Sequence, residues 1–270
     1  EFRRVLFRSK AIAVLKKVQR LDSSRFDLYE RLGELYRRQG LLKEAVGQYE
    51  SLADHYHRQD QKVEAVAVYR RLIEIEPQGL GHRLRVAQLY EDLGQLDRVA
   101  SEYRDIARFM LGDRAFRAYA ACLMFAAGGL YAFLTGSAPA LIRFLGETPQ
   151  QFGFDFATIM LGYIAFSFLG GRLVNRFGID NLLGAGVIMA AIGGVAMAGL
   201  AWAGIAAVWA IVVPMMVFMA AFALILPQAT AGAMSPFPDS AGMASSLLGV
   251  LQAGAGAVVS AALGLLDDGT

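Results

Sequence analysis

Hydrophobic residues follow two different patterns along this 270-residue chain. Between residues 10 and 110 they recur every three or four positions among charged residues, with one proline, Pro77. This spacing is typical of amphipathic helices. From residue 118 onward the uncharged runs lengthen to 25 residues (118–142), 58 residues (181–238) and 27 residues (240–266). The pattern therefore predicts an all-α chain with a polar first part and an apolar second part.

The apolar part is long enough for several membrane-spanning helices, since a helix needs roughly 20 apolar residues to cross the hydrocarbon core. The 58-residue run divides at Trp202 and Gly204, because tryptophan favours the membrane interface and glycine favours a turn. We expect spans at about 116–136, 153–172, 182–203, 206–226 and 244–266. A buried core helix explains one such run but not five in succession, so the sequence predicts an integral membrane protein.

The expected spans carry residues that affect helix packing. Pro214 lies inside the fourth span and Pro227 follows it, so we expect interrupted helices of the kind found in transporters. Small residues recur every four positions in the last span, a spacing that lets helices approach closely in lipid. They are Ala253, Ala257 and Ala261 and, on the next stripe, Gly256, Ser260 and Gly264. Both features indicate a bundle of several helices.

Charge separates the same two parts. Residues 1–117 hold 23 Lys and Arg and 18 Asp and Glu, whereas residues 118–270 hold 3 and 6. The net charge of +2 is therefore +5 on the first part and −3 on the second, which excludes a single soluble domain. One cysteine, Cys122, excludes the disulfide-stapled secreted class. The basic residues alternate with acids, and no basic stripe with aromatic residues indicates a nucleic-acid partner.

Basic residues near the span ends predict the orientation in the membrane. Arg114 and Arg117 precede the first span, Arg143 follows it, and Arg172 and Arg176 follow the second. Because loops rich in Lys and Arg stay in the cytoplasm, we expect the polar part and the loop with Arg172 and Arg176 inside, and Arg143 outside.

The polar part contains an internal repeat. Positions 34 residues apart match, and a second set matches at 54 residues, which fits a 34-residue period plus one 20-residue helix. The first set is Ala11 with Ala45, Leu15 with Tyr49, and Tyr69 with Tyr103; the second is Tyr36 with Tyr90, Gly40 with Gly94, and Tyr49 with Tyr103.

These residues resemble the tetratricopeptide signature over residues 10–111. The matching positions are Tyr29-x2-Leu32-Gly33-x2-Tyr36-x3-Gly40-x4-Ala45-x3-Tyr49, then Glu64-Ala65-Val66-x2-Tyr69 before Pro77, then Val86-Ala87-x2-Tyr90-x3-Gly94. The sequence departs from the signature at Arg83, where a large apolar residue is usual. The resemblance implies stacked helix pairs that bind a protein or peptide partner on a concave face.

No group of residues predicts a metal, a cofactor or a catalytic reaction. The three histidines, His55, His57 and His82, are expected to be solvent-exposed helix residues, because an i, i+2 pair on one helix cannot bind the same metal. Phosphate-binding glycine loops and nucleophile motifs are absent from the sequence. We expect neither an enzyme nor a cofactor.

The apolar part, residues 112–270, is similar to the bicyclomycin and multidrug-resistance branch of the major facilitator superfamily. The short loop motif G-x-L-x-D-R-x-G is matched by Gly171, Leu173, Arg176 and Gly178, while Asn175 replaces the usual acid and Ile179-Asp180 replace the following basic pair. Two further stretches are similar, Tyr131-Ala132-Phe133-Leu134-Thr135-Gly136-Ser137-Ala138-Pro139 with Pro149-Gln150-Gln151-Phe152-Gly153, and Leu226-Pro227-Gln228-Ala229-Thr230 with Pro236-Phe237-Pro238.

This resemblance corresponds to helices seven to eleven of a twelve-helix transporter. It implies proton-driven export of a small molecule through the bacterial inner membrane, with lipid as the surrounding partner and a substrate of unknown identity. We expect a partial half of this kind not to transport alone. Asp155 is an acid near a span, and we expect it at the outer interface rather than in a proton relay.

Residues 1–9 (EFRRVLFRS) resemble a translated sequencing adapter. We therefore expect an artefact at this end, and a transporter fragment joined to an unrelated repeat segment by an assembly error. The alternative is a membrane-anchored tetratricopeptide scaffold that binds a protein partner on the cytoplasmic side.

Overall fold

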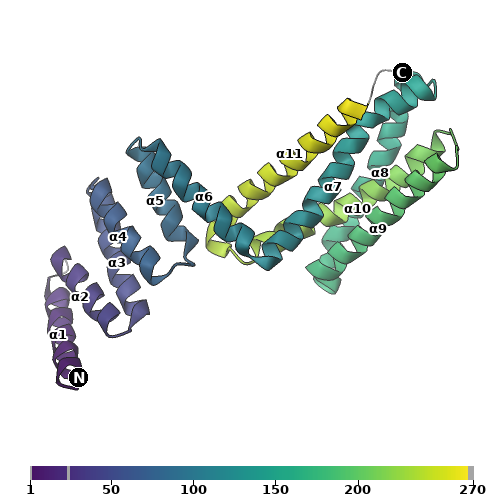
Figure 1. The fold of residues 1–270 in the computed structure, drawn as a ribbon. Helices are drawn as coiled ribbons and strands as arrows, with labels where there is room; N and C mark the ends of the chain where they lie inside the picture. The colour runs from purple at the N-terminus through teal and green to yellow at the C-terminus, as the bar shows by residue number, and fades with distance from the viewer. Residues whose placement is uncertain (1, 23–24, 267–270) are drawn as a thin grey trace. The chain divides into compact units, whose positions relative to one another are not determined.

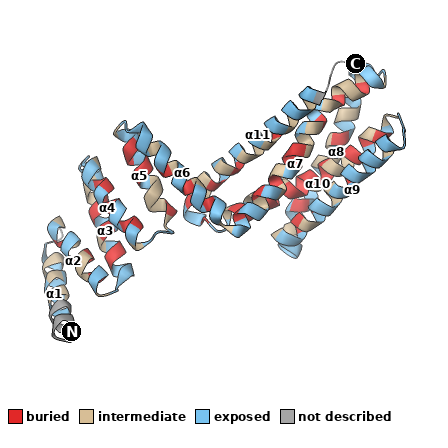
Figure 2. Ribbon diagram, in the orientation of Figure 1, coloured by how far each residue is buried: buried red, intermediate tan, exposed pale blue. Residues whose placement is uncertain are grey.

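A computed structural model describes residues 2–22 and 25–266, and within these ranges it contains helices and no strand. The chain divides into two compact units, Glu1–Phe109 and Met110–Thr270, called here the amino-terminal and carboxy-terminal units. Figure 1 shows the helices of each unit, and Figure 2 shows which of their residues are buried.

The amino-terminal unit is a series of helices in which each packs against the next. Contacts join α1 to α2, α2 to α3, α3 to α4 and α4 to α5. The helices are α1 (Phe2–Leu21), α2 (Phe26–Arg38), α3 (Leu42–Arg58), α4 (Lys62–Ile75), α5 (Leu80–Asp92) and α6 (Leu96–Gly112), the last of which ends just past the unit boundary. The Arg98 guanidinium of α6 lies over the Tyr90 ring of α5, 5.3 Å from its centroid.

Three turns of this unit have the same hydrogen-bonded geometry. Each contains one residue with positive φ, and the next N–H donates to the carbonyl of a tyrosine in the preceding helix, as in a helix C-cap. The positive-φ residues are Gly40 (76°), Asp60 (57°) and Gly94 (70°). The bonds run from Leu41 to Tyr36, Gln61 to Tyr56 and Gln95 to Tyr90 at 2.9–3.0 Å. The middle turn is absent from the repeat predicted from the sequence, because aspartate occupies its glycine position.

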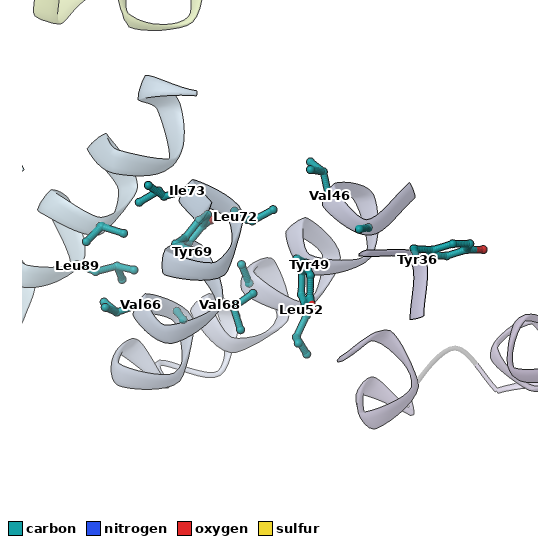
Figure 3. Packing of buried hydrophobic residues seen from close by; sticks show 14 of the residues in the cluster. Tyr36, Val46, Tyr49, Leu52, Val66, Val68, Tyr69, Leu72, Ile73 and Leu89 are labelled. Atoms are coloured by element: carbon teal, nitrogen blue, oxygen red, sulfur yellow. The ribbon is translucent and has the colours of Figure 1, made fainter. Parts of the chain in front are cut away.

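Large side chains fill the space between these helices. Tyr49 of α3 is 1% exposed and packs among Leu52, Leu72 and other buried residues of one continuous cluster (Figure 3). Gly33 of α2 permits the contact, because a Cβ at this position would lie 2.9 Å from two ring carbons of Tyr49. The α2–α3 pair therefore depends on a small residue facing a large one.

Among its described residues, the carboxy-terminal unit contains five helices long and apolar enough to cross a membrane. They lie in α7 (Arg114–Ala138) with the π-helical η1 (Pro139–Phe144), α8 (Pro149–Phe177), α9 (Ile179–Trp202), α10 (Trp209–Met234), and η2 (Pro238–Ser240) with α11 (Ala241–Leu266). A helix of this kind covers each of the five stretches in which a span is expected. The fourth runs to Met234 rather than to residue 226, and Gly204 forms the expected turn with a φ of 69°.

The central helix of this unit is α10, which contacts α7, α8 and α9, while α11 packs mainly on α7 (Figure 1). Glycines bring the neighbours close to its backbone. A Cβ at Gly162 of α8 would lie 2.6 Å from the Met216 carbonyl oxygen, and one at Gly193 of α9 would lie 2.9 Å from the Pro214 carbonyl oxygen.

The expected interruption of the fourth span is wrong, because α10 continues through both Pro214 and Pro227. Each proline removes one backbone donor, and α7, α8 and α9 pack along α10. Membrane helices tolerate proline where neighbouring elements compensate in this way.

We predict that Gly33→Ala loosens the α2–α3 pair. The added methyl group would overlap the buried Tyr49 ring, and overpacking of this kind costs about 1–3 kcal/mol. Hydrogen–deuterium exchange of the full chain in detergent should show faster exchange in peptides from α2 and α3.

The matched control for Gly33→Ala is Gly47→Ala in α3, which has no atom within 4 Å of its Cβ position. Alanine favours a helix by about 1 kcal/mol over glycine, so exchange in this control should be unchanged or slower. Equal exchange in the two variants would contradict the packing described here.

Candidate functional site

The predicted loop motif lies almost entirely inside a helix. Gly171, Leu173, Asn175 and Arg176 occupy the last two turns of α8, and α9 begins at Ile179. The prediction that these residues form a loop is therefore wrong, because Gly178 alone separates α8 from α9. Its φ of 78° ends α8, and its N–H donates to the Val174 carbonyl at 2.9 Å. Glycine adopts this φ without steric cost, so the motif forms a one-residue hinge.

A polar bond beside this hinge joins α9 to α7. The Tyr119 hydroxyl donates to Asp180 Oδ1, and Asp180 lies in the first turn of α9. The Tyr119 ring passes over Gly232 of α10, where a Cβ would lie 2.5 Å from two ring carbons. The structure thus brings α7, α9 and α10 together near Asp180, a residue that the sequence marked only as a departure from the family motif. Tyr119 and Gly232 were missed, because no sequence signal connects them.

A hollow of about 680 Å³ lies next to the motif, between α8, the start of α9 and α10. Gly171 and Val174 line one side, and its other walls are mainly apolar. Its polar side chains include Tyr163 of α8 and Gln228 of α10, and Gln228 is 5% exposed. Apolar hollows with a few polar groups are typical small-molecule sites.

Two carboxyl groups face each other at the start of α8. Thr148 and Gln151 form a capping box, in which the Gln151 N–H donates to Thr148 Oγ1 and the Thr148 N–H donates to Gln151 Oε1. This cap places Glu147 just before the helix and Asp155 in its second turn. Glu147 Oε2 and Asp155 Oδ2 are buried, with no hydrogen-bond donor among the described residues. Burial, and then the neighbouring Asp155 carboxyl, raises the pKa of Glu147.

The amino-terminal unit has a charged groove of about 850 Å³ between α2, α3 and α4. Arg71 binds Glu30 at 2.6 Å, and Arg38 binds Glu34 at 2.7 Å. The Arg38 guanidinium lowers the pKa of Glu34. The groove is lined by Asp27, Glu30, Glu34 and Glu74 and by Arg31, Arg37, Arg38 and Arg71. The opposite charges are equal in number, so charge alone does not select an acidic or a basic partner.

The histidines are less exposed than expected. His57 is exposed, but the His55 ring stacks on Phe26 with centroids 3.4 Å apart. The His82 side chain is 15% exposed and packs near Tyr69, with ring centroids 6.2 Å apart. The expectation fails for His55 and His82 because their rings fill gaps between helices. Within the described residues, no group of three potential ligands could hold a metal ion.

Comparison with known proteins connects the chain to drug-resistance transporters. Multidrug resistance protein D of Escherichia coli is 30% identical over 143 residues, which are 53% of this chain and 36% of the relative. A bicyclomycin resistance protein homolog of Haemophilus influenzae is 28% identical over 140 residues, 50% of the chain and 34% of the relative. The uncharacterized MFS-type transporter YdgK of Bacillus subtilis is 29% identical over 156 residues, which are 58% of this chain and 39% of the relative.

The chain spans just over a third of the length of these curated relatives. No family model matches the sequence. No solved structure matches it significantly.

We predict that Tyr119 and Asp180 are energetically coupled. Tyr119→Phe and Asp180→Asn should each destabilise the carboxy-terminal unit, and the double variant should cost less than the sum of the two, with a coupling energy of about 0.5–1.5 kcal/mol. Denaturant-dependent alkylation of Cys122, the single cysteine of the chain, measures this unfolding in detergent.

The control cycle pairs Tyr119→Phe with Asp239→Asn, because Asp239 is an exposed acid of the same unit. These two changes should be additive. Additive changes in the Tyr119–Asp180 cycle would show that the bond contributes no stability.

Glu147 should make the stability of the unit depend on pH. Because its pKa is raised in the fold, its contribution is fully present below the unfolded pKa of about 4.3 and is lost as the pH rises through the folded pKa. Glu147→Gln should therefore reduce the fall in melting temperature between mildly acidic and neutral pH. Asp239→Asn serves as the control and should keep the wild-type dependence. An unchanged dependence in Glu147→Gln would contradict the facing-carboxyl arrangement.

Proposed function

We propose that residues 112–270 are part of a proton-coupled exporter of small drug-like molecules in the bacterial inner membrane. The observation that carries this proposal is the set of five apolar helices in a chain whose relatives are named as drug-resistance transporters. The matched stretches of 140–156 residues are close in length to the carboxy-terminal unit, which supports placing the similarity there.

The surface of this unit favours a hydrocarbon environment. Only 6% of the most apolar window of α8 and 11% of that of α11 are buried within the structure. Phe154 and Phe168 of α8 are 76% and 68% exposed, and Val258 of α11 is 70% exposed. Exposed apolar surface on this scale is rare in soluble monomers, so lipid or further helices are its natural cover.

The proposal assigns substrate contact to the hollow between α8 and α10. Tyr163 and Gln228 supply hydrogen-bonding groups among apolar walls, which suits an amphipathic small molecule. Export requires a second wall for such a path, and the chain covers only 34–39% of its relatives. We therefore expect this chain alone not to export.

The proposal also includes an orientation. The motif with Gly171, Asn175 and Arg176 faces the cytoplasm together with the amino-terminal unit, and Arg143 lies at the outer side. The distribution of Arg and Lys supports this, since basic ends remain on the cytoplasmic side.

A second candidate is a membrane-anchored scaffold in which the amino-terminal unit is a tetratricopeptide array. The helix pairs and the groove lined by Glu30 and Arg71 favour it, because such grooves suit peptides that pair with both charges. In the first proposal the two units come from separate genes and residues 1–9 derive from an adapter. An uninterrupted gene across residues 105–120 in the source DNA would favour the scaffold.

We predict no drug resistance from the full chain alone in a bacterium that lacks its own exporters. Co-expression with the amino-terminal part of the Haemophilus influenzae relative should raise the inhibitory concentration of bicyclomycin, since it supplies the other wall of the path. Gln228→Ala, expressed to the same level, should reduce the gain. Resistance from the chain alone would contradict the need for further helices. No resistance from the two co-expressed parts, although both are inserted in the membrane, would count against export.

A further inference from the structure

The largest hollow described for the carboxy-terminal unit lies away from the motif, at the opposite end of the helices. It is about 990 Å³ in volume and lies between η1, the end of α9 and the connection from α9 to α10. Its walls are mostly aliphatic and aromatic, as at Pro139, Phe144, Met197 and Ile211. Arg143 is the only charged side chain among the described residues that line it.

The local backbone explains how Arg143 comes to lie at this hollow. Pro139 begins η1 and has no N–H for a regular helical bond. The helix widens into a π-turn, and the Leu145 N–H donates to the Ala140 carbonyl five residues earlier. π-Turns within helices are frequent at functional sites. Here the turn sets Arg143 at the mouth of an apolar hollow.

Arg143 has no acidic partner in the described part of the chain. No carboxylate oxygen lies within 4.0 Å of its guanidinium, and the acids nearest in sequence, Glu147 and Asp155, face each other instead. An arginine beside apolar walls without a counter-ion is suited to an external anion, and its fork geometry matches phosphate oxygens.

Aromatic residues place this end at the membrane interface. Trp202 ends α9 and is 94% exposed, Trp209 begins α10 and is 56% exposed, and Phe144 is 86% exposed. Tryptophan concentrates at the level of the lipid headgroups. A hollow at this depth combines a charged group, Arg143, with apolar walls, which is the polarity of a lipid with a charged headgroup and acyl chains.

We propose that this hollow binds an anionic phospholipid, with Arg143 on the phosphate and the aliphatic walls around the first part of an acyl chain. Basic pockets between membrane helices recognise anionic headgroups by the same chemistry. The site rests on membrane placement of the carboxy-terminal unit, which alkaline extraction reports separately, and does not depend on drug export.

The test is native mass spectrometry of the detergent-solubilised full chain titrated with phosphatidylglycerol or with phosphatidylcholine of the same acyl chains. We expect phosphatidylglycerol to bind more tightly. Arg143→Gln should weaken its binding about fivefold, as for one interfacial charge, and leave phosphatidylcholine binding within about twofold. Arg143→Lys should keep most of the preference.

Two further variants separate this site from general attraction. Arg117→Gln removes an exposed charge near the other end of α7 and should leave binding unchanged. Ala140→Leu fills the hollow and should weaken both lipids. Glycerol phosphate, which lacks acyl chains, should not compete. Competition by glycerol phosphate would identify a free-phosphate site and overturn the proposal, as would equal effects of Arg143→Gln and Arg117→Gln.

Discussion

Close contact between α10 and its neighbours is the interaction on which the carboxy-terminal unit depends. The hydrophobic effect does not drive helices together in lipid, so dispersion forces at short range hold them. Gly162 and Gly193 allow α8 and α9 to meet the α10 backbone itself. The same contacts cover the region around Pro214, which explains why a helix with two internal prolines stays continuous. The hollow beside the motif and the Tyr119 contact are both built on α10.

The described residues of the amino-terminal unit are also helical, but a different interaction holds their helices together. Its helices carry charges on one side, and burial of large side chains such as Tyr49 and Leu72 removes apolar surface from water. Positive-φ turns at Gly40, Asp60 and Gly94 fix the spacing of successive helices. Glycine therefore has two roles in both units. It ends helices, as at Gly40 and Gly178, and it lets helices approach closely, as at Gly33 and Gly193.

The sequence predicted the five membrane-length helices and the Gly204 turn. Both follow from local properties, namely the length of the uncharged stretches and the position of one glycine. The sequence did not predict the Asp60 turn, where aspartate takes a conformation usually signalled by glycine. The motif around Asn175 was expected as a loop, but only Gly178 has a non-helical conformation. Tyr119 and Asp180 lie 61 residues apart, so only the packing of α7 and α9 on either side of α10 brings them together.

These contacts determine where the carboxy-terminal unit can change shape. The Tyr119–Asp180 bond joins α7 to α9, and both pack on α10, so the bond adds to a set of contacts that links these three helices. The helix α8 is joined to α9 at Gly178, has few other contacts with it and packs mainly on α10. Few residues of its most apolar stretch are buried within the structure. The hollow beside Tyr163 and Gln228 lies between α8 and α10. Because α10 also packs on α7 and α9, whereas α8 contacts mainly α10, α8 is the less tightly held wall of this hollow. The end of α8 is set by the positive φ of Gly178, which does not require the acid missing at Asn175.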